Sequence, residues 1–354
     1  MSNLANNRPD KSQLQIGAQK QLFESDNTFF PKPHANETLY SWCVRFHRLS
    51  SNRKSYITSK QLFRNASAGF RHDFPSHLAN FSEITQDLFG DIDKLIYEHT
   101  IFPIFAPFLS RVAVNDAIQN MTNGVRTRVT YRLGQRGSPD FTIAPLKACP
   151  YCIHEDVDIL GYPIWHVDHQ IPTVLTCPKH NNLLSMTSQS FHAGGLKDWH
   201  FPNGIPNSEW EFIMTTPYSI RPRLSKLSKW SIGFLQYAER TFDPDLLRAA
   251  LYLRARKRGF VTDDGALKLK LLTKEFCSAY KNIDQVPGFS FIKGAHLEHG
   301  GFIGSIMLNI GYNKHPLRNL LLMEFLFDTP EMFISECEHA HDQEMLSNDK
   351  TDSD

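Results

Sequence analysis

Residues 146–184 read LKACPYCIHEDVDILGYPIWHVDHQIPTVLTCPKHNNLL, and this stretch decides how the rest of the chain is interpreted. It contains CPYC at 149–152 and CPKH at 177–180. A Cys-Pro-Tyr-Cys taken alone is typical of a redox dithiol, whereas two such pairs taken together are typical of a zinc site. The choice between these interpretations separates an enzyme from a recognition protein.

The spacing of the two pairs favours zinc. Each pair is separated by two residues, and 24 residues lie between the pairs. Structural zinc takes four tetrahedral nitrogen and sulfur ligands, and each short loop presents two of them from one tight knuckle. The sequence therefore predicts a single structural Zn²⁺, whose ligands are Cys149, Cys152, Cys177 and His180. His166 and His169, inside the intervening loop, remain alternatives for the fourth ligand.

The redox interpretation needs more than the tetrapeptide. A thioredoxin-like motif lies between a strand and a helix of a βαβ unit. The residues after Cys152, IHEDVDILGYP, are rich in acids and His and then reach a Gly and a Pro, so they do not predict a long packed helix. No phosphate-binding Gly-rich loop and no nucleophile motif are found, so we predict no catalytic residues and no enzymatic activity.

Bulk composition limits the class of protein. The chain has 354 residues, 41% of them hydrophobic, which predicts two or three domains with sizeable cores. The first twenty residues lack the apolar core of a signal peptide, and the longest apolar runs, 101–109 and 320–327, are too short to span a bilayer. We therefore expect a soluble, cytoplasmic protein with no membrane partner.

A helix-turn-helix is predicted near the N-terminus. Apolar residues recur at helical spacing from Leu39 to Leu49, SSNRKS breaks the pattern, and a second short helix follows in YITSKQLFRNAS, with Ile57, Leu62 and Phe63 inward and Thr58 outward. The second helix of this motif enters the major groove of DNA. The predicted DNA-binding residues here are Arg53, Lys54, Lys60, Gln61 and Arg64. The alternative is an ordinary helical hairpin with a solvated polar face.

The near-zero net charge of +1 hides a local imbalance. Residues 221–274 hold thirteen Lys/Arg and five Asp/Glu, whereas residues 324–354 hold ten acids and one Lys. A basic stretch of this kind suits a phosphate backbone, although a solvated helix face is the equal alternative. The further DNA-binding residues predicted in this basic module are Arg254, Arg256, Lys257 and Arg258.

The predicted fold class is mainly α, with an N-terminal helical domain that contains the helix-turn-helix, a central zinc finger or ribbon, and a C-terminal helical domain. The predicted boundaries are 1–27 for a disordered lead-in, 28–140 for the first helical domain, 141–195 for the Cys3His zinc finger, 196–335 for the basic C-terminal module, and 336–354 for an acidic disordered tail.

These motifs resemble those of the TniQ/TnsD family, the target-site selectors of bacterial cut-and-paste transposons. The most specific part is CPYC…GYPIWHVDHQIPTVLTCPKHNNLL, and the opening FFPKPHANETLYSWCVRFHRLS (29–50) is also similar. Three further stretches resemble the TnsD branch: FPSHL (74–78), EHTIFPIFAPFLS (98–110) and KHPLRNLLLMEFLF (314–327). The resemblance covers residues 29 to 335.

The resemblance implies a non-enzymatic adaptor that marks an insertion site on double-stranded DNA and recruits the AAA+ ATPase regulator of the element, while a separate transposase cuts and joins DNA. It also implies that the Cys3His set binds zinc, with His169-Gln170 as a structural part of the finger.

One departure opens an alternative. TnsD-type proteins carry a further C-terminal region, whereas this chain ends soon after LLLMEFLF. The shorter form is similar to TniQ proteins that dock on a CRISPR RNA-guided complex and have little DNA specificity of their own. A thiol-redox enzyme that uses Cys-Pro-Tyr-Cys remains a third and remote alternative.

Overall fold

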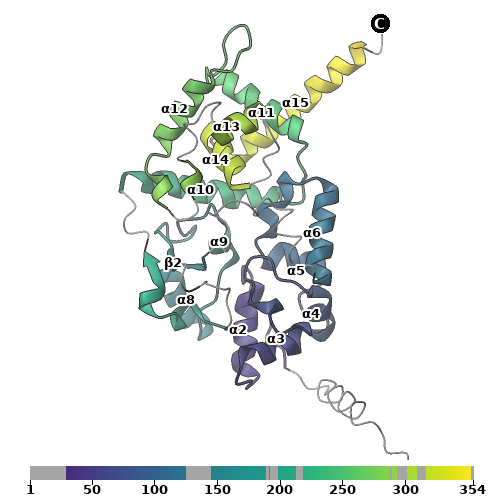
Figure 1. The fold of residues 1–354 in the computed structure, drawn as a ribbon, viewed down its shortest axis with the longest axis vertical. Coiled ribbons are helices and arrows are strands. Elements are labelled where there is room, and N and C mark those ends of the chain that lie inside the picture. Colours follow the sequence, from purple (N-terminus) through teal and green to yellow (C-terminus); the bar gives the residue numbers. More distant parts are fainter. Residues whose placement is uncertain are drawn as a thin grey trace, which may run out of the picture.

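The computed structural model describes residues 29–124, 145–188, 191, 198–212, 218–286, 289–292, 301–308 and 316–351. The fold is mainly α, as predicted, with one small sheet (Figure 1). In Figure 1 the N-terminal helices lie at the lower right, the part around CPYC and CPKH lies beside them at the lower left, and the helices from residue 221 onward form the upper part. The predicted disordered lead-in lies outside the described residues.

The N-terminal part is built from five helices, which are α2 (Leu39–Leu49), α3 (Ser55–Phe63), α4 (Leu78–Ile84), α5 (Ile92–His99) and α6 (Arg111–Asn123). Thr38 caps α2 through a hydrogen bond from the Ser41 N–H to its hydroxyl (3.0 Å). The inward face of α2 carries the buried Trp42, whose ring meets Phe81 and Phe89 edge to face. This aromatic cluster joins α2 to the segment around α4.

The helix pair α2–α3 has the predicted order, but the faces of α3 differ from the prediction. Ile57 is 39% exposed, whereas Thr58 is fully buried. The Thr58 hydroxyl is buried because it bonds the ring of His47 (2.6 Å) and accepts a hydrogen bond from the Asn52 amide (3.0 Å). A threonine with two polar partners can be buried, and the inward position expected for Ile57 was wrong.

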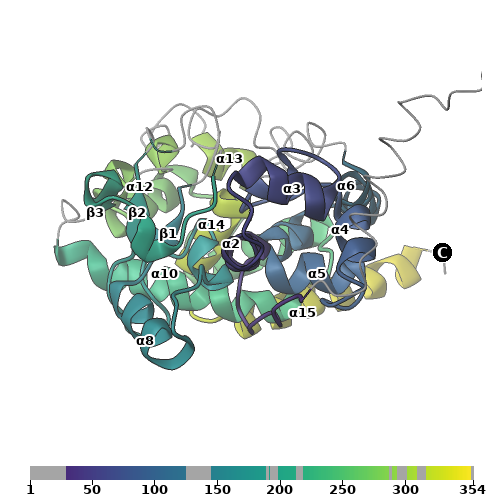
Figure 2. The same ribbon diagram turned by 90° about the horizontal axis from the view of Figure 1, so that it is seen from below.

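The central part contains three short strands and two helices. These are β1 (Lys147–Ala148), α8 (Pro150–Leu160), α9 (Val167–Gln170), β2 (Ser185–Thr187) and β3 (Trp210–Phe212). The sheet is antiparallel in the order β1-β2-β3. The segment after CPYC therefore does form a helix, but Cys152 is its only buried residue, and α8 lies at the outside of the molecule (Figure 2).

The C-terminal part consists of α10 (Arg221–Phe234), α11 (Pro244–Lys257), α12 (Leu269–Ala279), α13 (Gly301–Met307), α14 (Pro316–Leu326) and α15 (Pro330–Thr351). Helix α14 is buried nearly throughout, which explains why LLLMEFLF is apolar on all sides. Its one buried acid, Glu324, pairs with Arg223 of α10 (2.8 Å) and also bonds the Tyr280 hydroxyl. The buried charge is thus compensated by two neighbouring elements.

Helix α15 crosses the boundary predicted between the C-terminal domain and the acidic tail. The structure has a helix, rather than a disordered tail, from residue 336 to Thr351, and residues 352–354 lie outside the described part of the chain. Phe333, Cys337 and Ala340 are buried at helical spacing. The acids on the other faces dominate the composition and conceal this apolar stripe.

The three parts share one continuous hydrophobic core rather than three separate ones. The chain before α2 pairs with the segment before α9, where the Thr38 N–H donates to the Trp165 carbonyl (2.9 Å) and the Val167 N–H donates to the Asn36 carbonyl (2.8 Å). On the other side, the Ser228 hydroxyl of α10 accepts from the Leu175 N–H (3.0 Å). The predicted domains are therefore packed together as one body. No helix within the described ranges is long and apolar enough to cross a membrane.

A buried ion pair connects these parts. Glu37 and Arg45 are almost fully buried, and two hydrogen bonds join them (2.6 and 2.8 Å). Arg45 also donates to the Tyr162 hydroxyl in the central part (3.2 Å). We predict that Arg45→Met lowers the free energy of unfolding by about 3–5 kcal/mol, because it leaves the Glu37 carboxylate buried without a cation. Urea unfolding followed by circular dichroism measures this change.

The double variant Glu37→Leu/Arg45→Met is the control, because it removes both charges together. We expect it to recover a large part of the lost stability. A single variant that unfolds at the same urea concentration as the unaltered protein would contradict the assigned role of the pair.

Candidate functional site

The first knuckle is formed where β1 meets α8. Cys149 has extended backbone angles and acts as the N-cap residue of α8, and Pro150 occupies the first helical position, where its missing N–H costs nothing. One turn later the Ile153 N–H donates a hydrogen bond to the Cys149 carbonyl (3.0 Å). This first helical turn places Cys152 on the same side as Cys149. The helix start therefore presents two thiols on one side.

The second knuckle is a tight loop between residues 176 and 183. Thr176 and Leu183 form an isolated antiparallel bridge, and the Cys177 N–H donates to the Asn182 carbonyl (2.8 Å). Asn181 adopts a left-handed conformation (φ 56°), which Asn tolerates better than most residues. The loop brings Cys177 and His180 to the same side, opposite the first knuckle.

The ligand atoms of Cys149, Cys152, Cys177 and His180 lie within 4.8 Å of one another. The Cys152 and Cys177 sulfurs are 3.6 Å apart, and His180 Nδ1 lies 3.6, 3.3 and 3.6 Å from the sulfurs of Cys149, Cys152 and Cys177. A tetrahedral zinc ion with ordinary bond lengths separates its ligand atoms by about 3.5–3.8 Å. The four side chains could therefore hold a metal ion, and their spacing and chemistry fit zinc.

The two alternative histidines have other positions. His169 is buried with Nε2 3.9 Å from the Cys152 sulfur, outside the group of four mutually close ligand atoms. His166 bonds the carboxylate of Asp156 (2.9 Å) and stacks near His169. His169 thus lies next to the cluster, and His166 lies against His169 and Asp156.

The cluster has the electrostatics of a metal site. The three thiols are hydrogen-bonded to one another, which lowers the pKa of Cys149 and raises the pKa of Cys152. A lowered thiol pKa favours the thiolate, which is the form that binds metal. The second ring nitrogen of His180 faces the Glu155 carboxylate (3.1 Å), which in turn pairs with Lys179. A carboxylate behind a ligating imidazole fixes the ring orientation and raises the basicity of the ligand.

The placement of CPYC argues against the redox alternative. The motif does lie between a strand and a helix, but β1 belongs to an antiparallel sheet whose described strands are two or three residues long. A βαβ unit requires a parallel strand after the helix. Among the described residues, Cys149 and Cys152 also share their site with Cys177 and His180, which a simple dithiol does not require.

Comparison with known proteins agrees with this architecture. Residues 28–184 match the TniQ family model, a range that starts before α2 and ends just after the second knuckle. The chain thus contains a TniQ domain, which spans 157 of its 354 residues. It is 29% identical, over 160 residues, to the transposon Tn7 transposition protein TnsD of Escherichia coli. That match covers 44% of this chain and 31% of TnsD.

Within the TniQ domain, the predicted DNA-binding residues of the helix-turn-helix fall into two groups. Arg53, Lys54 and Lys60 are exposed, and their side chains form no ion pair or hydrogen bond among the described residues. Gln61 instead accepts a hydrogen bond from the Asn52 amide (2.9 Å), and Arg64 forms a bidentate pair with Glu83 of α4. Two of the five predicted side chains are thus engaged within the TniQ domain itself.

Outside the TniQ domain, most of the basic residues of α11 have structural contacts. Arg254 donates to the Leu326 carbonyl (3.0 Å), and Lys257 pairs with Glu336 (2.7 Å). Arg258 bonds the Phe325 carbonyl and lies over the rings of Phe260 and Phe325. Arg256 is exposed, and no described residue pairs with it. The peak of positive charge in the sequence thus mainly fastens α11 to α14 and α15.

Two functional candidates were not predicted from the sequence. Glu155 lies behind His180 in the Cys/His cluster. On α12, Lys270 and Lys274 are exposed one helical turn apart, while Leu272 and Phe276 are buried on the opposite face. The helical spacing of LKLLTKEF (269–276) could have predicted these two exposed lysines. The denser positive charge at residues 254–258 drew the prediction to α11 instead.

We predict that Cys177→Ser removes the metal and destabilises the chain, because a serine hydroxyl is a poor substitute for a thiolate ligand. The bound metal should fall from one ion per chain to near zero, and the melting temperature should fall by roughly 5 °C or more. Elemental analysis and a thermal melt measure both effects.

Cys277→Ser is the matched control, because Cys277 is half-buried and lies outside the cluster. It should keep one metal ion and nearly the original melting temperature. Full metal content in the Cys177→Ser protein would show that the ligand set is wrong.

A separate prediction concerns the carboxylate behind the imidazole. Glu155→Gln should weaken metal affinity by roughly 10–100-fold, because the amide no longer stabilises the orientation and basicity of the His180 ring. A competition titration against a chromogenic chelator measures the affinity. Asp158→Asn, on the same helix but directed to His154, is the control and should leave the affinity unchanged.

Proposed function

We propose that this protein is a transposon target-site selector that binds double-stranded DNA and recruits the AAA+ regulator of the element. The observation that carries the proposal is the TniQ domain, with its similarity to the transposition protein TnsD. That domain contains both the helix-turn-helix and the metal cluster. Zinc, as one structural ion in the Cys3His cluster, is part of the same proposal.

The surface of α3 supports DNA binding. Arg53 and Lys54 stand at the turn before α3, where the positive end of the helix dipole adds to their charge, and Lys60 follows on the exposed side of the helix. Tyr56 and Ile57 are 49% and 39% exposed in the first turn. Apolar side chains at this position of a recognition helix contact thymine methyl groups in the major groove.

The turn between α2 and α3 is held from within. Asn52 donates from its amide group to both Thr58 (3.0 Å) and Gln61 (2.9 Å), and the ring of His47 bonds Thr58. A fully hydrogen-bonded turn keeps the two helices at a fixed angle, so that α3 requires little reordering when it meets DNA.

The metal supports the same surface indirectly. The loop between the knuckles contains Trp165, which is fully buried and bonds the backbone at Thr38 and the hydroxyl of Ser41. A metal ion that closes this loop therefore also stabilises the start of α2. In the C-terminal part, Arg256 and the two lysines of α12 are exposed cations that suit phosphate contacts.

The second candidate function is an adaptor that docks on a CRISPR RNA-guided complex and takes its sequence specificity from the guide. One observation favours it: Gln61 and Arg64, the predicted side chains best suited to reading bases, bond Asn52 and Glu83 instead. Because Gln61 and Arg64 are engaged within the domain, Arg53, Lys54 and Lys60 remain to contact DNA. Such cations bind phosphates and do not distinguish one base sequence from another.

DNA binding by the metal-loaded chain tests the proposal. We predict that Lys54→Glu/Lys60→Glu weakens DNA binding at least tenfold near physiological salt and reduces the salt dependence by about two phosphate contacts. Lys94→Glu, alone and paired with Lys229→Glu, is the control, since these lysines are exposed on α5 and α10. Fluorescence anisotropy across a salt series measures both quantities.

The same titrations separate the two candidate functions. A steep salt dependence with preference for one sequence supports a direct reader of an attachment site. Weak binding that is equal for specific and scrambled duplexes supports the adaptor. If the Lys54→Glu/Lys60→Glu variant binds DNA as tightly as the unaltered protein, α3 is not part of the DNA interface.

A further inference from the structure

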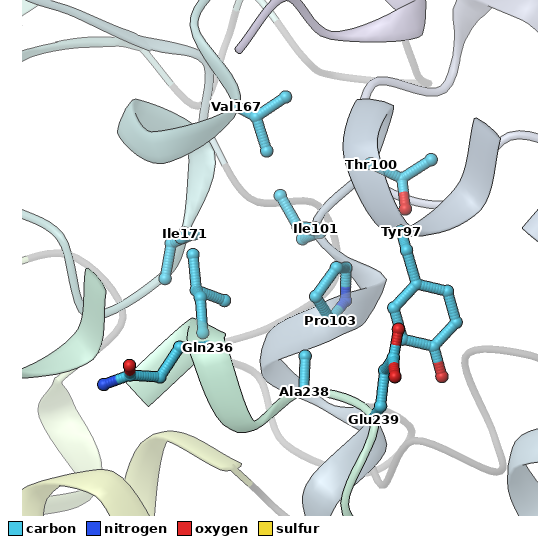
Figure 3. A pocket seen from close by; sticks show the side chains of 10 residues that line it. Tyr97, Thr100, Ile101, Pro103, Val167, Ile171, Gln236, Ala238 and Glu239 are labelled. Carbon is cyan, nitrogen blue, oxygen red and sulfur yellow. The ribbon is translucent and has the colours of Figure 1, made fainter. Parts of the chain in front are cut away.

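A small pocket opens where the three parts of the chain meet (Figure 3). Ile101 and Pro103 line it from the segment after α5, Val167 and Ile171 line it from α9 and the residue that follows, and Ala238 lines it from the loop after α10. Tyr97 and Glu239 stand together at one side (Figure 3). No single part of the chain forms this pocket alone.

The size and lining of the pocket limit what can occupy it. Its volume is about 220 Å³, below the roughly 300–1,000 Å³ of sites that enclose a cofactor or a small-molecule substrate. The side chains that line it are predominantly aliphatic, and the polar groups Gln236 and Glu239 are exposed. Such a pocket fits one large apolar side chain, which is how protein interfaces seat their energetically dominant residues.

The surroundings of the pocket are acidic. Glu239 lines it, and Asp93 of α5 is close enough to act with Glu239 on Tyr97, whose pKa is raised by burial and by these two carboxylates. Glu331 adds a third carboxylate, since it accepts a hydrogen bond from Gln236 (2.9 Å).

The nearby cations do not neutralise this charge. Arg240 pairs with Glu338 (3.3 Å) and lies over the ring of Tyr237, which leaves Lys94 as an exposed cation on α5. The rim therefore carries three carboxylates against one uncommitted lysine among the described residues. Charge complementarity then favours a cationic occupant.

We propose that this pocket binds a partner protein through a single large apolar side chain flanked by lysine and arginine residues. The inference rests on the proposed recruiting role, because a selector that recruits a regulator needs a protein-binding surface in addition to its DNA-binding one. The basic surfaces of α3 and α12 repel such a segment, so the two kinds of partner bind different faces.

The occupant would contact all three parts of the chain at once. Val167 lies two residues from Trp165, and its N–H already pairs with Asn36 before α2. An apolar side chain between α5, α9 and the loop after α10 adds buried contacts to each of them. Occupancy should therefore also raise the melting temperature of the full chain.

The test uses three fluorescein-labelled peptides with the full chain: KRKLFKRK, KRKSSKRK and EDELFEDE. We expect the first to bind roughly tenfold or more tightly than the other two in fluorescence anisotropy titrations. Ala238→Leu, which fills the pocket, and Glu239→Lys, which reverses its charge, should each abolish most of this preference. Asp263→Lys, the same charge change at an exposed acid between α11 and α12, should leave it intact.

Equal binding of KRKLFKRK and KRKSSKRK, or binding that survives Ala238→Leu, would overturn the proposal. Glu239 is exposed, so its variant keeps the test decisive if the filled pocket lowers the melting temperature. The peptide titrations contain no DNA. A failure here with intact DNA binding refutes the pocket alone, whereas lost DNA binding with intact peptide binding refutes the DNA-binding role alone.

Discussion

The closure of the loop between the two knuckles is the constraint on which this architecture depends. Cys149 and Cys152 leave one end of a 24-residue segment, and Cys177 and His180 bring the other end back beside them. The segment itself holds the buried Trp165 and the backbone that pairs with Asn36 and Thr38. The four side chains that could hold a metal ion thus lie at the two ends of the segment that packs the central part against the start of α2.

Charge in this protein serves two purposes that composition does not distinguish. Arg45, Arg223 and Arg258 lie against buried acids, carbonyls or aromatic rings and hold helices together, whereas Lys54, Lys60 and Lys274 face solvent. The planar guanidinium forms several hydrogen bonds at once and stacks on rings, which suits the internal positions. Total charge is therefore a poorer guide to a nucleic-acid-binding surface than the lysines that have no partner within the described residues.

The sequence predicted local features well and tertiary pairings poorly. The ligand spacing identified the Cys/His cluster because each knuckle is encoded within four residues, and the helical repeat from Leu39 to Leu49 matches the bounds of α2. The burial of Thr58 depends on His47 and Asn52, and the role of Lys257 depends on Glu336, 79 residues away. The periodicity of a sequence does not indicate such distant partners. The inward face of α3 and the continuation of α15 beyond residue 336 were therefore not predicted.

The pairing between the start of α2 and the segment at Trp165 also affects when the N-terminal helices can fold during synthesis. Chains emerge from the ribosome N-terminus first at about 5–20 residues per second. Helices α2 and α3 leave the ribosome before the residues that complete their packing. Those later residues are Trp165, which bonds Ser41, and Trp199, which bonds the Ser55 carbonyl (3.1 Å). The newly made helix pair α2–α3 therefore lacks the contacts of Trp165 and Trp199 for at least several seconds, and its aromatic surface stays exposed for that time. Folding of this region is thus completed only after its own residues have been synthesised, and the second knuckle leaves the ribosome within the same interval.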